Sequence, residues 1–233
     1  MKKQSAFTIK FIAYTGMMTA IVYVCTLIGI PFPAFNFNIG DSAILICAAL
    51  FNPLSAMIAG GLGSFLADLT TYPATMLYTL VIKAVEGLVA GLIFQAIYKW
   101  YDKAETPDKK RFALKVVFAV LTCVACSMFM AAGYFVCKAF MYGTIESALT
   151  SLPKNVLQAT VSTLLASLAL YAARLEKIRP KTFISIVDAV KKSSSNSTPV
   201  EQSDVTETTV SPDDKADESA DEVTPDDTDE PQD

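Results

Sequence analysis

The sequence predicts an all-α integral membrane protein, in which six transmembrane helices form a bundle and a disordered tail follows. Three observations support this fold class. The chain has 233 residues, of which 52% are hydrophobic, and its mean hydropathy is +0.41. The apolar residues are gathered into runs, several of which reach the roughly 20 residues that cross a hydrocarbon core. Basic residues lie unevenly between these runs, as is typical of multi-pass membrane proteins.

Charge divides the chain into two regions. Residues 1–192 contain 18 Lys and Arg against 9 Asp and Glu, whereas residues 193–233 contain Lys215 alone against 14 acidic residues. The second region also has almost no large apolar side chains. We therefore expect a membrane domain over residues 1–192 and an acidic, disordered cytoplasmic tail over residues 193–233.

The apolar runs and the breaks between them predict the helices in order. The first run follows three lysines and ends at Pro31, and because further apolar runs follow, it is interpreted as a membrane anchor and not as a signal peptide. A marginal run at 42–51 ends at a turn signal, Asn52-Pro53. The six helices are expected at about residues 8–30, 41–51, 54–69, 76–98, 113–140 and 154–175.

The marginal second run decides the topology. Ten helical residues span about 15 Å, which is half of a hydrocarbon core of about 30 Å. Fifteen Lys and Arg lie at the N-terminus, at residues 99–115 and at residues 174–192, against only Lys138 and Lys154 in the remaining loops. The positive-inside rule therefore favours six crossings with both termini cytoplasmic. We expect a short second helix, preceded by a loop at residues 36–41 that dips into the fold.

Small residues four positions apart predict where helices approach closely in lipid. Gly16 and Ala20 form such a pair on the first helix, and Gly87 and Gly91 form one on the fourth. The third helix carries two series and is expected to be central. These series are Ala56, Gly60, Ser64 and Ala59, Gly63, Ala67.

Ionisable residues inside the apolar runs are candidates for function, because each costs about 2.5–3.5 kcal/mol at membrane depth. In the expected topology the few that occur lie in the external half, and uncharged hydrogen-bonding residues lie at the same level. Such a set suits a small polar organic molecule better than a metal ion. The predicted substrate-binding residues are Asn36, Asn38, Asp41, Asp68, Tyr72, Lys83, Glu86, Asn155 and Gln158.

Several of these residues also have a purely structural interpretation. Lys83 and Glu86 lie on one helix face and would form an ion pair that also neutralises Asp68. Asp41 is well placed as the N-cap of the second helix, and the two asparagines fit an ordinary loop. Glu146 is expected to be solvated in the loop before the last helix.

Several kinds of chemistry are excluded. The chain has no histidine, which removes histidine-ligated metals and Ser–His–Asp catalysis, and it has no G-x-x-x-x-G-K-[ST] motif for ATP. Cys123 and Cys126 have a redox or metal spacing but lie in an apolar run, where small helix residues are the better interpretation. We expect no metal, no cofactor, no nucleic-acid partner and no enzymatic activity.

Three segments resemble a known family. They are GDSAIL at 40–45, AGGLGSFLADL at 59–69 and IKAVEGLVAG at 82–91. In order and spacing they are similar to the substrate-binding S components of energy-coupling factor transporters, in the branch named for riboflavin, hydroxymethylpyrimidine or pyridoxine-type substrates. The resemblance covers about residues 8–175. Lys83 stands where relatives often have histidine, which leaves the vitamin open.

The resemblance implies a function. S components bind a vitamin or precursor near the outer face of the bacterial plasma membrane and work with a transmembrane coupling subunit and two cytoplasmic ATPase subunits. Gly16 and Ala20 correspond to the small residues that contact the coupling subunit in the family. We therefore expect a lipid-embedded substrate-binding subunit. The alternatives are a membrane scaffold or sensor that acts through the acidic tail, and an integral membrane enzyme.

Overall fold

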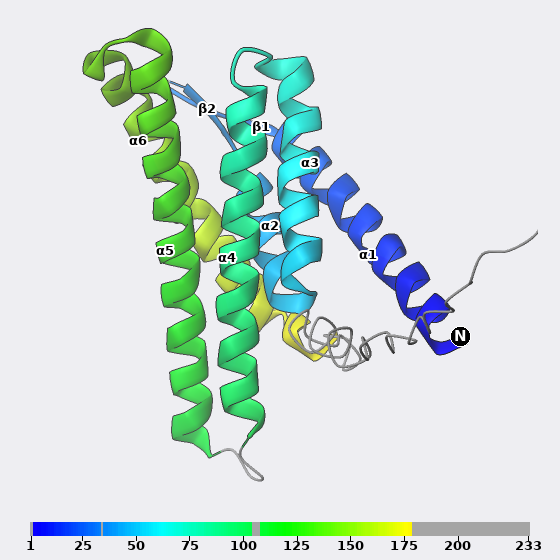
Figure 1. Ribbon diagram of the computed structural model, residues 1–233. Coiled ribbons are helices and arrows are strands. Elements are labelled where there is room, and N and C mark those ends of the chain that lie inside the picture. The colour runs from blue at the N-terminus through cyan, green and yellow to red at the C-terminus, as the bar shows by residue number, and fades with distance from the viewer. Residues whose placement is uncertain (1, 34, 104–107, 179–233) are drawn as a thin grey trace, which may run out of the picture. The chain divides into compact units, whose positions relative to one another are not determined.

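The computed structural model describes residues 2–33, 35–103 and 108–178, and within them six α-helices and one β-hairpin (Figure 1). The tail predicted for residues 193–233 lies outside the described residues. A π-helical turn at Leu168–Ala172 continues the last helix, and a short 3-10 turn at Leu175–Ile178 follows. In chain order the elements are α1 (Lys2–Leu27), β1 (Gly29–Phe32), β2 (Phe35–Asn38), α2 (Gly40–Leu50), α3 (Pro53–Thr71), α4 (Met76–Asp102), α5 (Lys109–Tyr142) and α6 (Ile145–Ser167).

The helix lengths confirm an all-α membrane bundle with a short second helix. Among the described residues, five helical segments are long and apolar enough to cross a membrane, and they belong to α1, α3, α4, α5 and α6 with its π-helical turn. The remaining helix, α2, has 11 residues and is about 16 Å long. All of its residues except Ile46 are buried, and it contacts α1, α3, α4 and α6. The short helix is therefore enclosed by the long ones.

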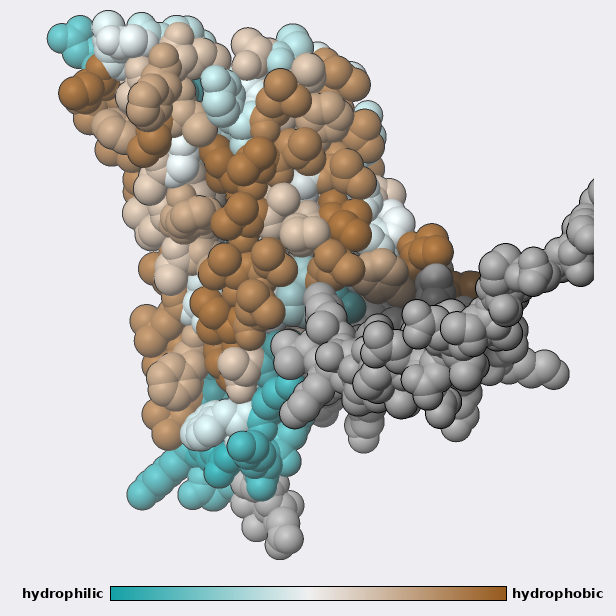
Figure 2. Space-filling view, viewed as in Figure 1, coloured by the Kyte–Doolittle hydropathy of each residue, from teal (hydrophilic) through white to brown (hydrophobic). Residues whose placement is uncertain are grey.

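The surface of the bundle fits lipid. Figure 2 shows an apolar band over the middle of α4 and α5 and hydrophilic residues at the end where these two helices are connected through residues 104–107. The exposed apolar side chains of this band include Leu92, Val117 and Leu121. A band of this kind is what a hydrocarbon core requires of the helices that face it. We call the hydrophilic end, formed by the C-terminus of α4 and the N-terminus of α5, the basic end.

Small residues bring α3 against two neighbouring helices, as the spacing predicts. A Cβ atom on Gly63 would lie 2.8 Å from the Thr19 carbonyl oxygen of α1, and one on Gly60 would lie 2.8 Å from the Lys83 carbonyl oxygen of α4. Contacts this short leave room only for hydrogen, so the backbones approach directly. Gly16 of α1 makes no such close approach, because nothing lies within 4 Å of the position that its Cβ would take.

A β-hairpin corrects the expected end of the first helix and the expected loop. α1 ends at Leu27 and not at residue 30, and Gly29 pairs with Asn38 in an antiparallel ladder that includes most of residues 28–38. This segment lies between α1 and α2, where no helix satisfies its backbone N–H and C=O groups, and pairing between the two strands satisfies them instead. The predicted loop at residues 36–41 is therefore a strand followed directly by the first turn of α2.

The last helix begins earlier than predicted. α6 starts at Ile145, and Pro153 lies inside it, whereas the sequence favoured a start at residue 154. Gly143, in a left-handed conformation with φ 68°, ends α5, so the turn between the helices is only two residues long. Glu146 consequently lies in the first turn of α6 and not in a loop, although it is exposed as expected.

Candidate functional site

A cavity of about 730 Å³ lies at the end of the bundle opposite the basic end. Residues of the β-hairpin, the α3–α4 connection, the C-terminal part of α5 and the N-terminal half of α6 line it, and these segments meet at one end of the bundle in Figure 1. We call this end the hairpin end. Six of the predicted site residues line the cavity. They are Asn36, Asn38, Asp68, Tyr72, Asn155 and Gln158.

The six lining residues differ in exposure. Asn155 and Gln158 are buried on one face of α6, Asn38 is half-buried, and Tyr72 is 52% exposed. The spacing of three between the two α6 residues puts both amides on the same wall, as the sequence indicates. The cavity therefore has polar groups both at depth and at its mouth.

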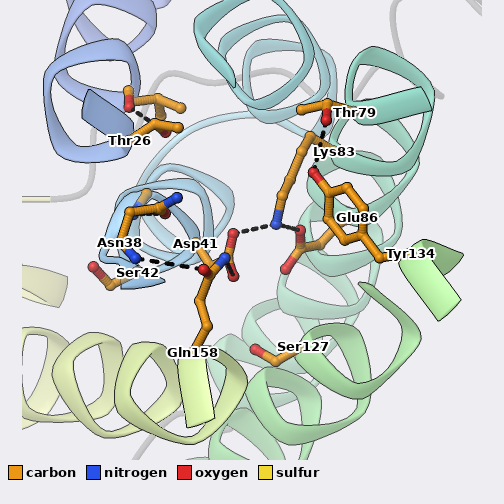
Figure 3. A network of polar contacts seen from close by, with 12 residues as sticks. Thr26, Asn38, Asp41, Ser42, Thr79, Lys83, Glu86, Ser127, Tyr134 and Gln158 are labelled. Carbon is orange, nitrogen blue, oxygen red and sulfur yellow. Dashed lines mark hydrogen bonds and ion pairs between the residues drawn. The ribbon is translucent and has the colours of Figure 1, made fainter. Parts of the chain in front are cut away.

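The other three predicted residues form an ionic group that does not line the cavity. Asp41, Lys83 and Glu86 are 1%, 3% and 0% exposed. The Lys83 ammonium donates to the carboxylate of Asp41 and, over 3.0 Å, to Oε2 of Glu86 (Figure 3). We call these three residues the buried ionic group. Removing either sign of charge would leave the other uncompensated in a low-dielectric interior.

Gln158 joins the buried ionic group to the cavity wall. Its Nε2 donates to Asp41 Oδ2 over 2.9 Å, and its Oε1 accepts from the backbone N–H of Asn38 over 3.4 Å. Both ends of the amide are thus engaged, which fixes the orientation of this side chain. The connection brings together α2, α6 and the end of β2.

Asp41 does not cap α2, which corrects the sequence interpretation. The cap position is Ile39, with no side-chain cap bond, and Asp41 lies inside the first turn. The Asn38 Oδ1 atom accepts from the Gly40 N–H over 3.1 Å instead. The Asp41 carboxylate is therefore free to accept from Lys83 and Gln158.

Asp68 has its own hydrogen-bond chain and forms no salt bridge with Lys83, so the ion pair expected around Lys83 includes Asp41 and Glu86 and does not include Asp68. Thr79 Oγ1 donates to Asp68 Oδ2 over 2.5 Å, and the Tyr134 hydroxyl donates to Thr79 Oγ1 over 2.9 Å. The Lys83 ammonium lies 5.7 Å from the Tyr134 ring centroid. Asp68 therefore belongs to the cavity wall, beside the buried ionic group.

Several residues of the wall were not predicted from the sequence. Lys138 and Tyr142 come from α5, Lys154 comes from α6, and Tyr134 lies deeper on α5. A signal for the two lysines was present, since they are the two basic residues that depart from the charge asymmetry between loops. No sequence signal distinguished these tyrosines from the other aromatic residues in apolar runs.

No metal site is apparent in the described part of the chain. No group of three or more His, Cys, Asp or Glu side chains is placed there to hold an ion. Cys123 and Cys126 are buried free thiols of the helix interior. Chemically, the cavity offers hydrogen-bond donors and acceptors, charged groups and aromatic rings to an organic molecule.

The fold defines a membrane-embedded helical protein with a cavity at one end. The comparisons with known proteins identify the family. Residues 6–176 match the model of the ECF-type riboflavin transporter S component, and the chain belongs to this family. The family consists of membrane subunits of transporters and not of enzymes. The expected recognition and fold class are thereby confirmed.

Two curated relatives share parts of the chain. A protein of Pyrococcus woesei, described as an uncharacterized protein in gap 3' region, is 42% identical over 89 residues, which are 37% of this chain and 55% of that protein. A UPF0397 protein of Leuconostoc citreum is 30% identical over 122 residues, 51% of this chain and 64% of that protein. The chain thus spans a little over half to just under two thirds of their lengths.

Proposed function

We propose that the chain is the substrate-binding subunit of an energy-coupling factor transporter, which captures a water-soluble vitamin or vitamin precursor at the outer face of the cell membrane. The observation that carries this proposal is the cavity of about 730 Å³ at the hairpin end. Its volume lies within the range of about 300–1,000 Å³ that is usual for small-molecule sites, and its lining combines rings with a few polar groups.

The charge distribution supports an outward-facing cavity. The basic end carries Lys99, Lys103, Lys109, Lys110 and Arg111, and the cavity lies at the opposite end. Under the positive-inside rule the basic end is cytoplasmic. The hairpin end then faces outward, where a nutrient arrives.

The positions of the nine predicted residues separate those that would contact the substrate from those that would position the cavity wall. Asn36, Asn38, Asp68, Tyr72, Asn155 and Gln158 line the cavity and would contact the substrate. Asp41, Lys83 and Glu86 act as positioning residues, since they hold α2 and α4 together and orient Gln158 from behind the wall. Substrate specificity would then depend on the wall, and the geometry of the wall on the buried ionic group.

Energy for uptake would come from separate chains. The 233 residues contain no P-loop, which agrees with a transmembrane coupling subunit and two cytoplasmic ATPase subunits as partners. The contact with the coupling subunit would lie on α1. Gly16 and Ala20 are exposed on that helix, beside the exposed apolar side chains of Met17 and Ile21. Such a face permits close approach of a partner helix.

Identification of the small molecule that copurifies with the full chain tests the proposal directly. We expect one vitamin-like compound, detected by mass spectrometry, and uptake of that compound by cells that also contain the coupling and ATPase subunits. Replacement of both Gly16 and Ala20 by Trp should abolish uptake and leave binding unchanged. If the double variant transports normally, the coupling surface is elsewhere; if purified protein neither carries nor binds a small molecule, the proposal fails.

A further inference from the structure

The wall of the cavity carries more accessible positive than negative charge. Lys138 of α5 and Lys154 of α6 line it, and both are half-buried. Asp68 is the acidic lining residue, but it is only 9% exposed and accepts a hydrogen bond from Thr79. A molecule that enters the cavity therefore meets two ammonium groups more readily than the single carboxylate.

Neither lysine forms a salt bridge within the described part of the chain. The salt bridges there join Lys83 to Asp41 and Glu86, and Lys115 to Glu176, and none includes Lys138 or Lys154. The carboxylates behind the wall are thus already bound to Lys83. The Lys154 ammonium lies 5.0 Å from the ring centroid of Tyr72, at the mouth of the cavity, which is a cation–π contact and leaves its hydrogen-bond donors available.

The positions of these two lysines are energetically unfavourable unless their ammonium groups are paired with an anion. Outside the three basic clusters and the buried Lys83 they are the remaining basic residues of positions 1–192, and both lie within helical segments long and apolar enough to span a membrane. A cation within a membrane-spanning helix is destabilising and is usually paired. An anionic ligand would supply the missing partner for both.

A neutral donor lines the same cavity as the lysines. The side-chain amide nitrogen of Asn155 is buried and has no hydrogen-bond partner among the described residues, and Asn155 lines the same cavity directly after Lys154. A buried donor without a partner costs about 1–3 kcal/mol, which an acceptor on a ligand would recover. Two ammonium groups and an amide donor together suit a carboxylate or a phosphate, which accept several hydrogen bonds at once.

We infer that the substrate is a small organic anion, whose carboxylate or phosphate group is bound by Lys138 and Lys154 and whose remainder lies among the tyrosines of the cavity. This inference rests on the proposed function and narrows it, because riboflavin, the compound in the name of the family model, carries no such group. The geometry assigns the two lysines as residues that determine specificity.

Matched pairs of anionic and neutral compounds test the inference. The full chain is placed in phosphatidylcholine nanodiscs, and its affinity is measured by calorimetry for nicotinate and nicotinamide, biotin and biotinamide, riboflavin 5′-phosphate and riboflavin, and pyridoxine 5′-phosphate and pyridoxine. We expect the anionic member to bind at least about tenfold more tightly in every pair that binds. The first two pairs report on a carboxylate and the last two on a phosphate.

Variants of the wall separate charge from shape. Lys138→Gln and Lys154→Gln should each weaken binding of the anion about ten- to hundred-fold, as expected for loss of a charge-assisted hydrogen bond, and change binding of the neutral member less than about threefold. Lys138→Arg, which keeps the charge, should retain the preference for the anion. Lys99→Gln, at the basic end, is the matched control and should change neither affinity. Asp68→Asn should strengthen anion binding.

The outcomes distinguish the inference from the proposed function. Equal binding of both members of a pair, or preference for the neutral member, overturns the inference that the substrate is an anion. The proposed function as a substrate-binding subunit is not affected by that result. Weaker anion binding by Asp68→Asn would indicate that the substrate also carries a positive charge, as a zwitterion does. That result would also overturn the inference of an anionic substrate. If no member of any pair binds and no compound copurifies, both the inference and the proposed function fail.

Discussion

Lys83 and Lys115 are both buried lysines, and they lie toward opposite ends of the bundle with different surroundings. Lys83 is 3% exposed and is held by two carboxylates, those of Asp41 and Glu86, which are themselves fully enclosed. Lys115 is 5% exposed and has one carboxylate, Glu176, at 2.8 Å. The side chain of Glu176 is 17% exposed, so this second ion pair lies at the rim of the structure.

The aromatic surroundings of Lys115 increase the contrast. Its ammonium lies 4.2 Å from the ring centroid of Tyr101 and 4.9 Å from that of Phe112. Rings and a partly hydrated carboxylate stabilise a cation without strict geometry. The Lys83 ammonium also lies 5.7 Å from the Tyr134 ring centroid, but its two carboxylates are fully enclosed and cannot be hydrated if Lys83 is removed. Burial of a lysine alone therefore does not determine how much its ion pair contributes to stability, because the enclosure of its partners decides what is left uncompensated.

The first prediction, with the clearest difference in outcome, concerns which end of the bundle faces the cytoplasm. In a background without the five native cysteines, Ala74→Cys in the α3–α4 connection should react with an impermeant maleimide added to intact cells. Thr106→Cys should react only after the cells are opened, because the positive-inside rule places the basic end in the cytoplasm. Reaction at position 106 in intact cells would reverse the orientation and remove the outward cavity.

The second prediction concerns loss of Lys83. Lys83→Met leaves two enclosed carboxylates without a cation and should cost about 3–5 kcal/mol of stability, seen as a lower thermal unfolding midpoint of the purified protein. The triple variant Asp41→Asn, Lys83→Met, Glu86→Gln removes all three charges and should recover much of this loss. A single variant as stable as the wild type, or a triple variant less stable than the single one, would contradict the account of the buried ionic group.

The third prediction separates the buried ionic group from the cavity wall. Gln158→Leu removes a lining amide that also binds Asp41, so the affinity for the copurified substrate should fall about ten- to hundred-fold. Glu86→Gln should lower the unfolding midpoint and reduce the affinity less than Gln158→Leu does, because Glu86 acts on the wall only through Lys83 and does not line the cavity. A large loss of affinity in Glu86→Gln without loss of stability would indicate that Glu86 itself contacts the substrate.

The smallest expected effect is that of Lys115→Met. Glu176 can be hydrated once its partner is removed, and an apolar side chain keeps contact with the surrounding rings. The loss of stability should therefore be about 1 kcal/mol, with binding unchanged. A cost equal to that of Lys83→Met under the same conditions would show that enclosure of the partners is not the deciding factor.

The sequence by itself determined the parts of the fold that depend on local composition. The length of an apolar run decides whether a helix can cross a membrane, so the six helices and the short second one were predictable, and so were the small residues that bring α3 against α1 and α4. The sequence also marked Lys83 and Glu86 as a pair, since residues three apart share a helix face.

Which distant residues meet depends on the tertiary structure. Asp41 pairs with a lysine 42 positions away, and it is not the helix cap that its local position suggests. Lys138 and Lys154 line the cavity together with Gln158 because α5 packs on α6 and α6 contacts β2. Residues 29–32 pair with residues 35–38 as strands because backbone groups there need partners. Such pairings depend on how helices are placed in space, and a single sequence carries no local signal for that placement.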